Sequence, residues 1–301
     1  MQKNSIALFT TSYPEGKQFL SDFFASLSAQ TDTKFDLWMG LDRIQEKELD
    51  EFICDNFSVT SLDREKNESN ISLRQRAIEQ MVEIYTGIIF VDSDDILAKT
   101  RVSAGRSSLE RYDVYGCAMK IIDEYGVDLK ISFQIPSDSN IASLLPRFNI
   151  FGLSNTCYSS EILKQCLPFP SDCVLLDWFV ATRAWAHDAH MYFDPVQRMS
   201  YRQHSSNTAR VIPPFTQEQI IKSTNLVLMH YMFVLNNIPE LPDSKRILIE
   251  TAQKYVESFN SSITQSPVIF QDYIRRLNKL PPNHIWWSCV AHPDLEAVWK
   301  S

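Results

Sequence analysis

Three aspartates stand close together directly after a short apolar run. Asp92, Asp94 and Asp95 follow residues 87–91, which are wholly apolar apart from a leading glycine and are typical of a strand buried on both faces. Open α/β sheets place their ligand crevices at the carboxyl ends of strands. Carboxylates this close raise one another's pKa, and Mg²⁺ or Mn²⁺ would relieve the repulsion while also taking substrate phosphates. The motif therefore predicts a metal site that neutralises a diphosphate. The alternative is a surface turn in which Asp94 or Asp95 caps the next helix.

A further acid, Asp177, stands at the start of a predicted helix over about 175–187 that is rich in aromatic residues. Its apolar neighbours on both sides would partly desolvate the carboxylate and raise its pKa toward a value useful to a general base. We therefore predict that Asp177 takes a proton from a hydroxyl group. The alternative is an aspartate of the N-cap or first turn that only stabilises the helix.

The composition excludes several classes of protein. The chain has 301 residues and a formal net charge of −8, which argues against broad nucleic-acid binding. Its seven glycines form neither a dinucleotide-binding fingerprint nor a P-loop, and its six cysteines form no C-x-x-C pair. No stretch reaches the roughly 18 uninterrupted apolar residues of a membrane span. We expect a globular protein with reduced cysteines in the cytoplasm.

The elements that must position these acids alternate along the first part of the chain. Apolar runs bounded by turns predict strands, and apolar residues at helical spacing predict the helices between them. This order predicts an α/β fold with a mostly parallel sheet. The strands are expected over 5–10, 35–41, 58–62 and 87–91, and the helices over 17–30, about 44–56 and 71–85.

The pattern is more mixed after residue 100 and becomes helical after Pro213-Pro214. We predict a domain over 1–212, with a nucleotide-binding half over 1–98 and an acceptor half over 99–212, followed by a helical extension over 213–301. The further elements are one or two strands within 112–122, an apolar stretch over 148–158 with a short helix opening at 159–161, strands at 191–193 and 197–202, and helices over 216–236 and 244–260.

Six segments stand in a characteristic order. They are I-A-L-F-T-T-S-Y-P at 6–14, L-D at 41–42, R-Q-R-A at 74–77, V-D-S-D-D at 91–95, L-L-D-W at 175–178 and Y-R-Q-H-S-S-N at 201–207. In order and spacing, these segments resemble family 2 glycosyltransferases of the GT-A fold over about two thirds of the chain. The resemblance implies a mixed, mostly parallel sheet with helices on both faces, and the family's DxD motif at residues 92–94.

The resemblance also implies roles for residues of this chain. The activity would be inverting transfer of a sugar from a nucleotide-diphosphate donor, with UDP-sugars favoured, to the hydroxyl of a saccharide or glycoconjugate acceptor in polysaccharide assembly. The family's usual glutamate stands as Leu176 here, which leaves Asp177 as the base. Donor-binding roles fall to Thr11, Tyr13, Asp42, Arg76 (preferred to Arg74), Asp92 and Arg202, and metal-binding roles to Asp94, Asp92 and His204.

Two other functions use similar residues. One is a Mg²⁺-dependent nucleotidyltransferase or phosphotransferase, although T-T-S-Y-P-E-G at 10–16 lacks the glycine-rich or lysine-rich loop of such enzymes. The other is a binding module for nucleotide sugars without catalysis.

The remaining aromatic and apolar residues allow several partners. Trp178 and Trp185 fit either the core or a wall for the acceptor, and Trp286, Trp287 and Trp299 fit either a tail packed on the domain or a partner surface. The apolar C-terminal helices fit burial, self-association or a peripheral position at the inner face of a membrane.

Overall fold

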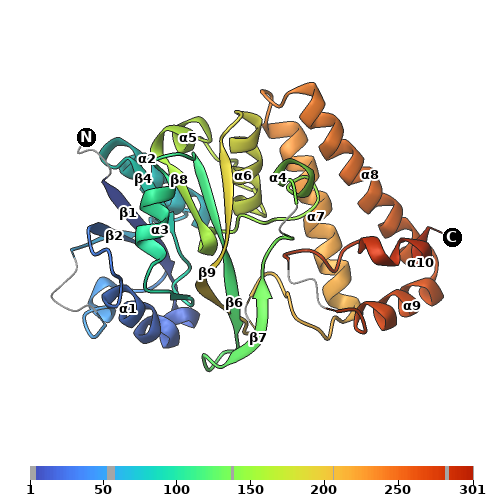
Figure 1. Ribbon diagram of the computed structural model, residues 1–301, viewed down its shortest axis with the longest axis horizontal. Coiled ribbons are helices and arrows are strands. Elements are labelled where there is room, and N and C mark those ends of the chain that lie inside the picture. The colour runs from blue at the N-terminus through green and yellow to red at the C-terminus, as the bar shows by residue number, and fades with distance from the viewer. Residues whose placement is uncertain (1–4, 53–57, 137–138, 206, 282–284, 301) are drawn as a thin grey trace.

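A computed structural model describes residues 5–52, 58–136, 139–205, 207–281 and 285–300 of the chain (Figure 1). The first part alternates strands and helices as predicted. Its elements are β1 (Ile6–Ser12), α1 (Leu20–Ser28), β2 (Phe35–Leu41), β3 (Val59–Asp63), α2 (Asn70–Ile84) and β4 (Gly87–Phe90).

The charged helix predicted over about 44–56 is wrong for the residues described there. The chain forms only a short 3-10 turn at Glu46–Glu48, and residues 53–57 lie outside the described part. The side chain of Glu48 accepts a hydrogen bond from the backbone N–H of Gln45, which favours a capped turn.

In the described part of the chain, nine strands form one mixed sheet in the order β3-β2-β1-β4-β8-β6-β9-β5, with β7 beside β6. The strands β3, β2, β1 and β4 are mutually parallel, as are β6 and β9. Phe9 of β1 pairs with Phe90 of β4, and Ser12 pairs with Leu41 of β2. The carboxyl ends of these strands therefore meet at one edge of the sheet.

The middle of the chain completes the sheet and its helical cover. Helix α1 packs against β5 and α3 against β4, while α2, α5, α6 and α7 pack one beside the next. The elements are β5 (Ile96–Leu97), α3 (Arg101–Ser108), β6 (Val114–Ile122), β7 (Asp128–Phe133), α4 (Ile141–Leu144), β8 (Thr156–Ser159), α5 (Ser160–Gln165), α6 (Leu176–Ala186) and β9 (Met191–Arg202).

One prediction in this region is corrected, and the structure of one apolar stretch is defined. The strands expected at 191–193 and 197–202 are one strand, β9, whose register against β6 shifts near Pro195 because proline cannot donate a ladder hydrogen bond. The apolar stretch 148–158 is a strand only at its end, in β8. Before it, the chain makes an isolated bridge at Asn149 and a 3-10 turn at Leu153–Asn155.

The C-terminal helices form a group beside α6, on the right of Figure 1. They are α7 (Gln217–Asn237), α8 (Asp243–Gln265), α9 (Pro267–Leu277) and α10 (Glu296–Trp299), which confirms the two helices predicted after residue 213. One continuous apolar core extends from Ile6 to Trp299. The division into units at residue 212 remains a prediction. Within the described ranges, every helix is too short or too polar to cross a membrane.

Gly116 in β6 provides a test of the core packing. An added Cβ there would lie 2.6 Å from the ring of buried Phe151, whereas at Gly40 in β2 it would lie 3.3 Å from the flexible end of Leu73. We expect Gly116→Ala to reduce the free energy of unfolding by about 1–3 kcal/mol through overpacking, measured by urea denaturation. Gly40→Ala is the matched control with a smaller loss, and equal losses in the two variants would contradict this account.

Candidate functional site

A cleft of about 430 Å³ lies at the edge of the sheet where β1, β2 and β4 end. Seven of the nine residues to which the sequence analysis assigned catalytic, donor-binding or metal-binding roles line it. They are Thr11, Tyr13, Asp42, Asp92, Asp94, Asp177 and His204. The structure therefore gathers acids that are far apart in the chain around one space, while Arg76 and Arg202 lie outside its lining.

The three carboxylates after β4 offer oxygens within 4.8 Å of one another. Asp94 is buried and is contacted by Tyr13 Oη at 3.2 Å and by His204 Nε2 at 2.8 Å. Burial, and next the charge of Asp94, raises the pKa of Asp92 to about 7. The same two causes hold the pKa of Asp95 well above its usual range. A divalent cation fits this set of oxygen ligands because it would offset both the burial and the repulsion.

Asp95 differs from the other two acids because both of its carboxylate oxygens have hydrogen-bond partners within the protein. It is fully buried, accepts a hydrogen bond from the backbone N–H of Arg202 at 2.7 Å and contacts the hydroxyl of Ser154. It therefore fastens the end of β4 to the end of β9, which leaves Asp92 and Asp94 facing the cleft.

Arg202, predicted to contact phosphate, is instead buried beneath the cleft and holds the turn after β4 in place. Its side chain is 1% exposed and donates to the carbonyls of Asp94 and Glu124, at 2.7 and 3.0 Å, and to Asp22 Oδ2 at 2.7 Å. The guanidinium also lies over the ring of Phe19. These contacts use its donors within the protein, so Arg202 orients the turn that carries Asp94.

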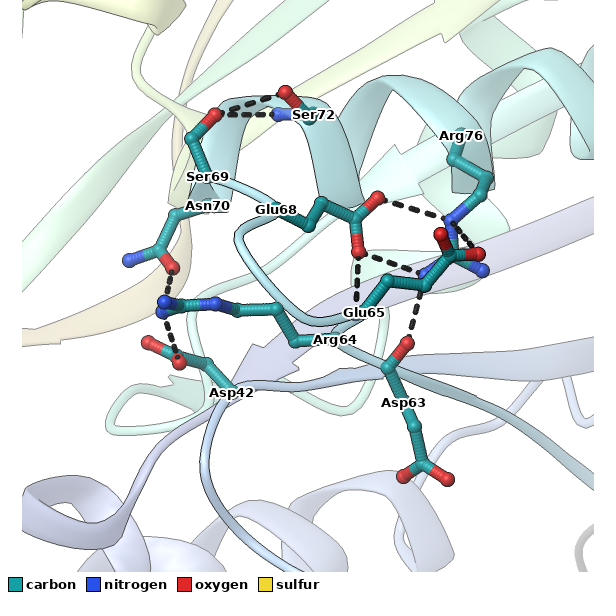
Figure 2. Close-up of polar contacts among 9 residues, drawn as sticks. All are labelled: Asp42, Asp63, Arg64, Glu65, Glu68, Ser69, Asn70, Ser72 and Arg76. Atoms are coloured by element: carbon teal, nitrogen blue, oxygen red, sulfur yellow. Dashed lines mark hydrogen bonds and ion pairs between the residues drawn. The ribbon is translucent and has the colours of Figure 1, made fainter.

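Of the two arginines of R-Q-R-A, Arg74 lines the cleft and Arg76 does not, whereas the sequence analysis preferred Arg76 for the donor site. Arg76 donates to Glu68 at 2.9 Å and to the carbonyl of Asp63 at 2.7 Å, on the side of α2 shown in Figure 2. Arg74 lines the cleft and donates to Thr11 Oγ1 at 3.2 Å. The helical period offered a signal, since buried Ala77, Ile78 and Met81 lie three, four and seven positions after Arg74.

Asp42, at the end of β2, belongs to a polar group that sequence reasoning missed in part. Its carboxylate accepts from Arg64 Nη1 at 2.6 Å, and Arg64 also donates to Asn70 Oδ1 at 3.1 Å (Figure 2). Asp42 is 3% exposed, and Asn70 lines the cleft beside it. Nothing local in the sequence links Arg64 to Asp42, because they meet only when β2 and β3 pair.

Asp177 stands at the start of α6 with its carboxylate held from two sides. Asn149 Nδ2 donates to Oδ2 at 2.8 Å, and the backbone N–H of Trp178 donates to Oδ1 at 2.8 Å. Desolvation raises the pKa of Asp177, although both hydrogen bonds and the charge of Arg74 oppose the shift. The same charge opposes the shift at Asp92. The charge of Arg74 therefore acts on both Asp92 and Asp177.

All five tryptophans named from the sequence are buried, and two of them also line the cleft. Trp178 is fully buried and stacks on His230 with ring centroids 4.0 Å apart. Trp185 is buried beside Lys245. Trp286 and Trp287 line the cleft, and Trp299 packs against Tyr255 and Phe259.

The fold resembles solved glycosyltransferases. No protein-family model matches the sequence, and the search of curated proteins found no match. The structure of Staphylococcus aureus TarS 1-349 in complex with UDP-GlcNAc is similar at a TM-score of 0.58 and 17% identity, over 81% of this chain and 70% of that chain. The mannosyltransferase PcManGT from Pyrobaculum calidifontis, in complex with GDP-Man and Mn²⁺, is similar at 0.59 and 11% identity, over 98% and 87%. At these identities the likeness shows a glycosyltransferase fold of the GT-A type.

Replacing Arg202 tests whether it frames the acid cluster. Arg202→Met leaves the Asp94 and Glu124 carbonyls without their donor, so we expect a loss of about 3 kcal/mol in the free energy of unfolding, measured by urea denaturation. Arg76→Met removes a more exposed ion pair and should cost about 1 kcal/mol or less. A smaller loss for Arg202→Met than for Arg76→Met would show that Arg202 is not structural.

Proposed function

We propose that the protein is a metal-dependent, inverting glycosyltransferase that moves a sugar from a nucleotide-diphosphate donor to a hydroxyl acceptor. The observation that carries the proposal is that Asp92, Asp94, Arg74 and Asp177 line one cleft on a glycosyltransferase fold. A cleft that holds a metal-binding acid pair, a cation and a desolvated carboxylate has the groups that sugar transfer from a diphosphate requires.

The donor occupies the part of the cleft nearest β1, β2 and β4 in this proposal. Asp42, with Arg64 and Asn70, faces the nucleobase, and its carboxylate can accept a further hydrogen bond from a pyrimidine N–H. That chemistry favours uridine. Arg74 replaces Arg76 as the cation that contacts phosphate, because Arg76 is paired with Glu68.

Asp92 and Asp94, with His204 beside Asp94, would hold a Mg²⁺ or Mn²⁺ ion. When bound, such an ion supplies positive charge that stabilises the departing diphosphate. The phenol of Tyr13 stays protonated, since burial and the charge of Asp94 raise its pKa, and it orients the Asp94 carboxylate.

Asp177 acts as the general base. It takes the proton of the acceptor hydroxyl as that oxygen bonds to the anomeric carbon, while the bond from this carbon to the diphosphate oxygen breaks. Direct displacement by one nucleophile inverts the anomeric centre. The acceptor is a saccharide or glycoconjugate in this proposal.

Binding of nucleotide and metal is the first test. We expect UDP to raise the melting temperature in the presence of Mn²⁺, and Asp94→Asn to abolish the part of the shift that requires Mn²⁺. Arg74→Ala should weaken UDP binding roughly 10- to 150-fold, since a hydrogen bond to a charged group is worth about 1.5–3 kcal/mol. Arg76→Ala is the matched control and should bind UDP as the wild type does. A panel in which no nucleoside diphosphate stabilises the wild type would refute the donor site.

The pH profile tests the base. Transfer requires ionised Asp177, so activity at saturating metal should fall as the pH drops through the pKa of Asp177, which lies above that of an ordinary aspartate. Asn149→Ala removes a hydrogen bond that lowers this pKa, so the acidic limb of kcat should move up by about one pH unit. Asp177→Asn should lose about 100-fold or more of the activity while retaining UDP binding. An unmoved limb in Asn149→Ala would argue against Asp177 as the base.

A further inference from the structure

Asp42, at the end of β2, presents one free carboxylate oxygen to the cleft. Its Oδ1 accepts from Arg64 Nη1 at 2.6 Å and from Arg43 Nε at 3.3 Å. Within the described part of the chain, Oδ2 has no hydrogen-bond partner, and it is not among the polar atoms that are closed off from solvent without one. Because Asp42 lines the cleft, Oδ2 is an acceptor that a ligand can reach.

Asn70, at the start of α2, adds a free donor beside this oxygen. Arg64 Nη1, which holds Asp42, also donates to Asn70 Oδ1 at 3.1 Å. A guanidinium only donates, so the atom it contacts is the amide oxygen, and the amide nitrogen Nδ2 points elsewhere. Figure 2 shows this nitrogen and the free oxygen of Asp42 on the same side of the Arg64 guanidinium. Asn70 is exposed and lines the cleft, and no described residue accepts from its Nδ2.

Arg43 supplies a second donor from the opposite side of Asp42. Its Nη2 lies 3.5 Å from Glu15, which follows β1, whereas Arg64 and Asn70 follow β3. Strand β2, which ends just before Asp42, lies between β1 and β3. The Arg43 side chain is 60% exposed and lines the cleft. Its ion pair with Glu15 is also exposed and therefore weak, so a ligand can take the place of Glu15.

The backbone at Arg43 is strained where the chain leaves β2. Its φ of +61° lies in the left-handed region, which residues other than glycine adopt rarely and at an energetic cost. Such strain clusters at ligand clamps and active sites, where the surrounding structure holds it in place. The strained turn leaves both Asp42 and Arg43 in the lining of the cleft.

These three side chains form a row of hydrogen-bonding groups. Because Asn70 and Arg43 flank Asp42 from the β3 side and the β1 side, the row is donor, acceptor, donor. Uracil has the complementary edge, with a carbonyl oxygen, the N3–H group and a second carbonyl oxygen in order. Cytosine places a ring acceptor opposite Asp42 and an amino group opposite a donor. Guanine directs its 2-amino group at a donor, and adenine has no carbonyl oxygen. Only the imide edge of uracil, which thymine shares, matches all three groups.

We propose that Arg43 and Asn70 determine which base the donor carries, by binding the imide edge of uracil together with Asp42. This inference rests on the proposed function and extends it from a preference through one hydrogen bond to recognition at three points. A site built from fixed hydrogen-bonding groups rejects a base that lacks their partners, because those groups are then left unpaired. Arg43 and Asn70 are therefore specificity-determining residues, and the ligand class is a diphosphate of uridine or thymidine.

Calorimetric titration of the full chain in the presence of Mn²⁺ tests this recognition. The ligands are UDP, CDP, GDP, N3-methyl-UDP and inorganic pyrophosphate, which has no base. We expect UDP to bind roughly tenfold or more tightly than CDP, GDP and N3-methyl-UDP, because each of these mismatches at least one of the three groups. N3-methyl-UDP isolates the contact with Asp42, since it differs from UDP only in the blocked N–H group.

Two variants remove the flanking donors one at a time. Asn70→Asp keeps the oxygen that Arg64 contacts and replaces the free donor by an acceptor, and Arg43→Met removes the other donor. Each should weaken UDP binding roughly tenfold, through the loss of one hydrogen bond to a carbonyl of the base. Pyrophosphate binding should change by less than about threefold, because solvent screens the exposed charge that each variant alters. At least one variant should also narrow the preference for UDP over CDP.

Arg275→Met and Asn236→Asp are the matched controls. The Arg275 side chain is 59% exposed, much like that of Arg43, but it pairs with Asp272 on α9 and does not line the cleft. Asn236 is exposed on α7, also outside the lining of the cleft. Both variants should bind UDP and pyrophosphate as the wild type does. Pyrophosphate binding by Arg43→Met and Asn70→Asp shows that those two variants fold.

Three outcomes overturn the proposal while leaving the donor site intact. They are wild-type protein that binds CDP or N3-methyl-UDP as tightly as UDP, pyrophosphate that binds as tightly as UDP, and UDP binding that neither Arg43→Met nor Asn70→Asp weakens. Failure of both UDP and pyrophosphate to bind the wild type is a different result, since it refutes the proposed function on which the base recognition rests.

Discussion

The structure depends on holding three carboxylates in a small, largely buried volume at the end of one strand. Such a cluster is unfavourable by burial and by repulsion, as the raised pKa values of Asp92 and Asp95 show. The protein uses one acid to fix the others: Asp95 binds the backbone of Arg202 and contacts Ser154. The Arg202 side chain in turn holds the Asp94 carbonyl. Asp92 and Asp94 are therefore the two carboxylates that face the cleft, where a bound cation can offset the repulsion between them.

The arginines around this cluster differ in whether an acidic side chain of the protein neutralises them. Arg76 is neutralised by Glu68, and Arg64 by Asp42, within the β3–α2 region of Figure 2. Arg202 is enclosed in the frame. Arg74 contacts the neutral hydroxyl of Thr11 and faces both Asp92 and Asp177. Its charge is thus the one directed at the cleft from α2, which is why the proposed phosphate contact falls to it.

The C-terminal extension is connected to the proposed base, Asp177, through two contacts. Trp286 bridges Asn149, and Asn149 donates to Asp177. The orientation of the proposed base therefore depends on a segment more than a hundred residues later in the chain. The extension shares one apolar core with the rest of the chain, and its Trp286 and Trp287 line the cleft.

The alternation of strands and helices, the acid cluster after β4 and the acid at the start of α6 could all be predicted from the sequence, because periodicity and strand ends are local properties. The sequence did not determine that residues 44–52 avoid a helix, which a local cap decides in competition with helix propensity. Nor did it determine that Arg202 is buried, or that Trp286 and Trp287 line the cleft while Trp178 is packed in the core. The last two outcomes depend on partners far away in the chain, Asp22 on α1 for Arg202 and Gly152 before β8 for Trp286. Only the packed tertiary structure brings those partners together, and the free energy of an ion pair or of a buried ring is set by that environment.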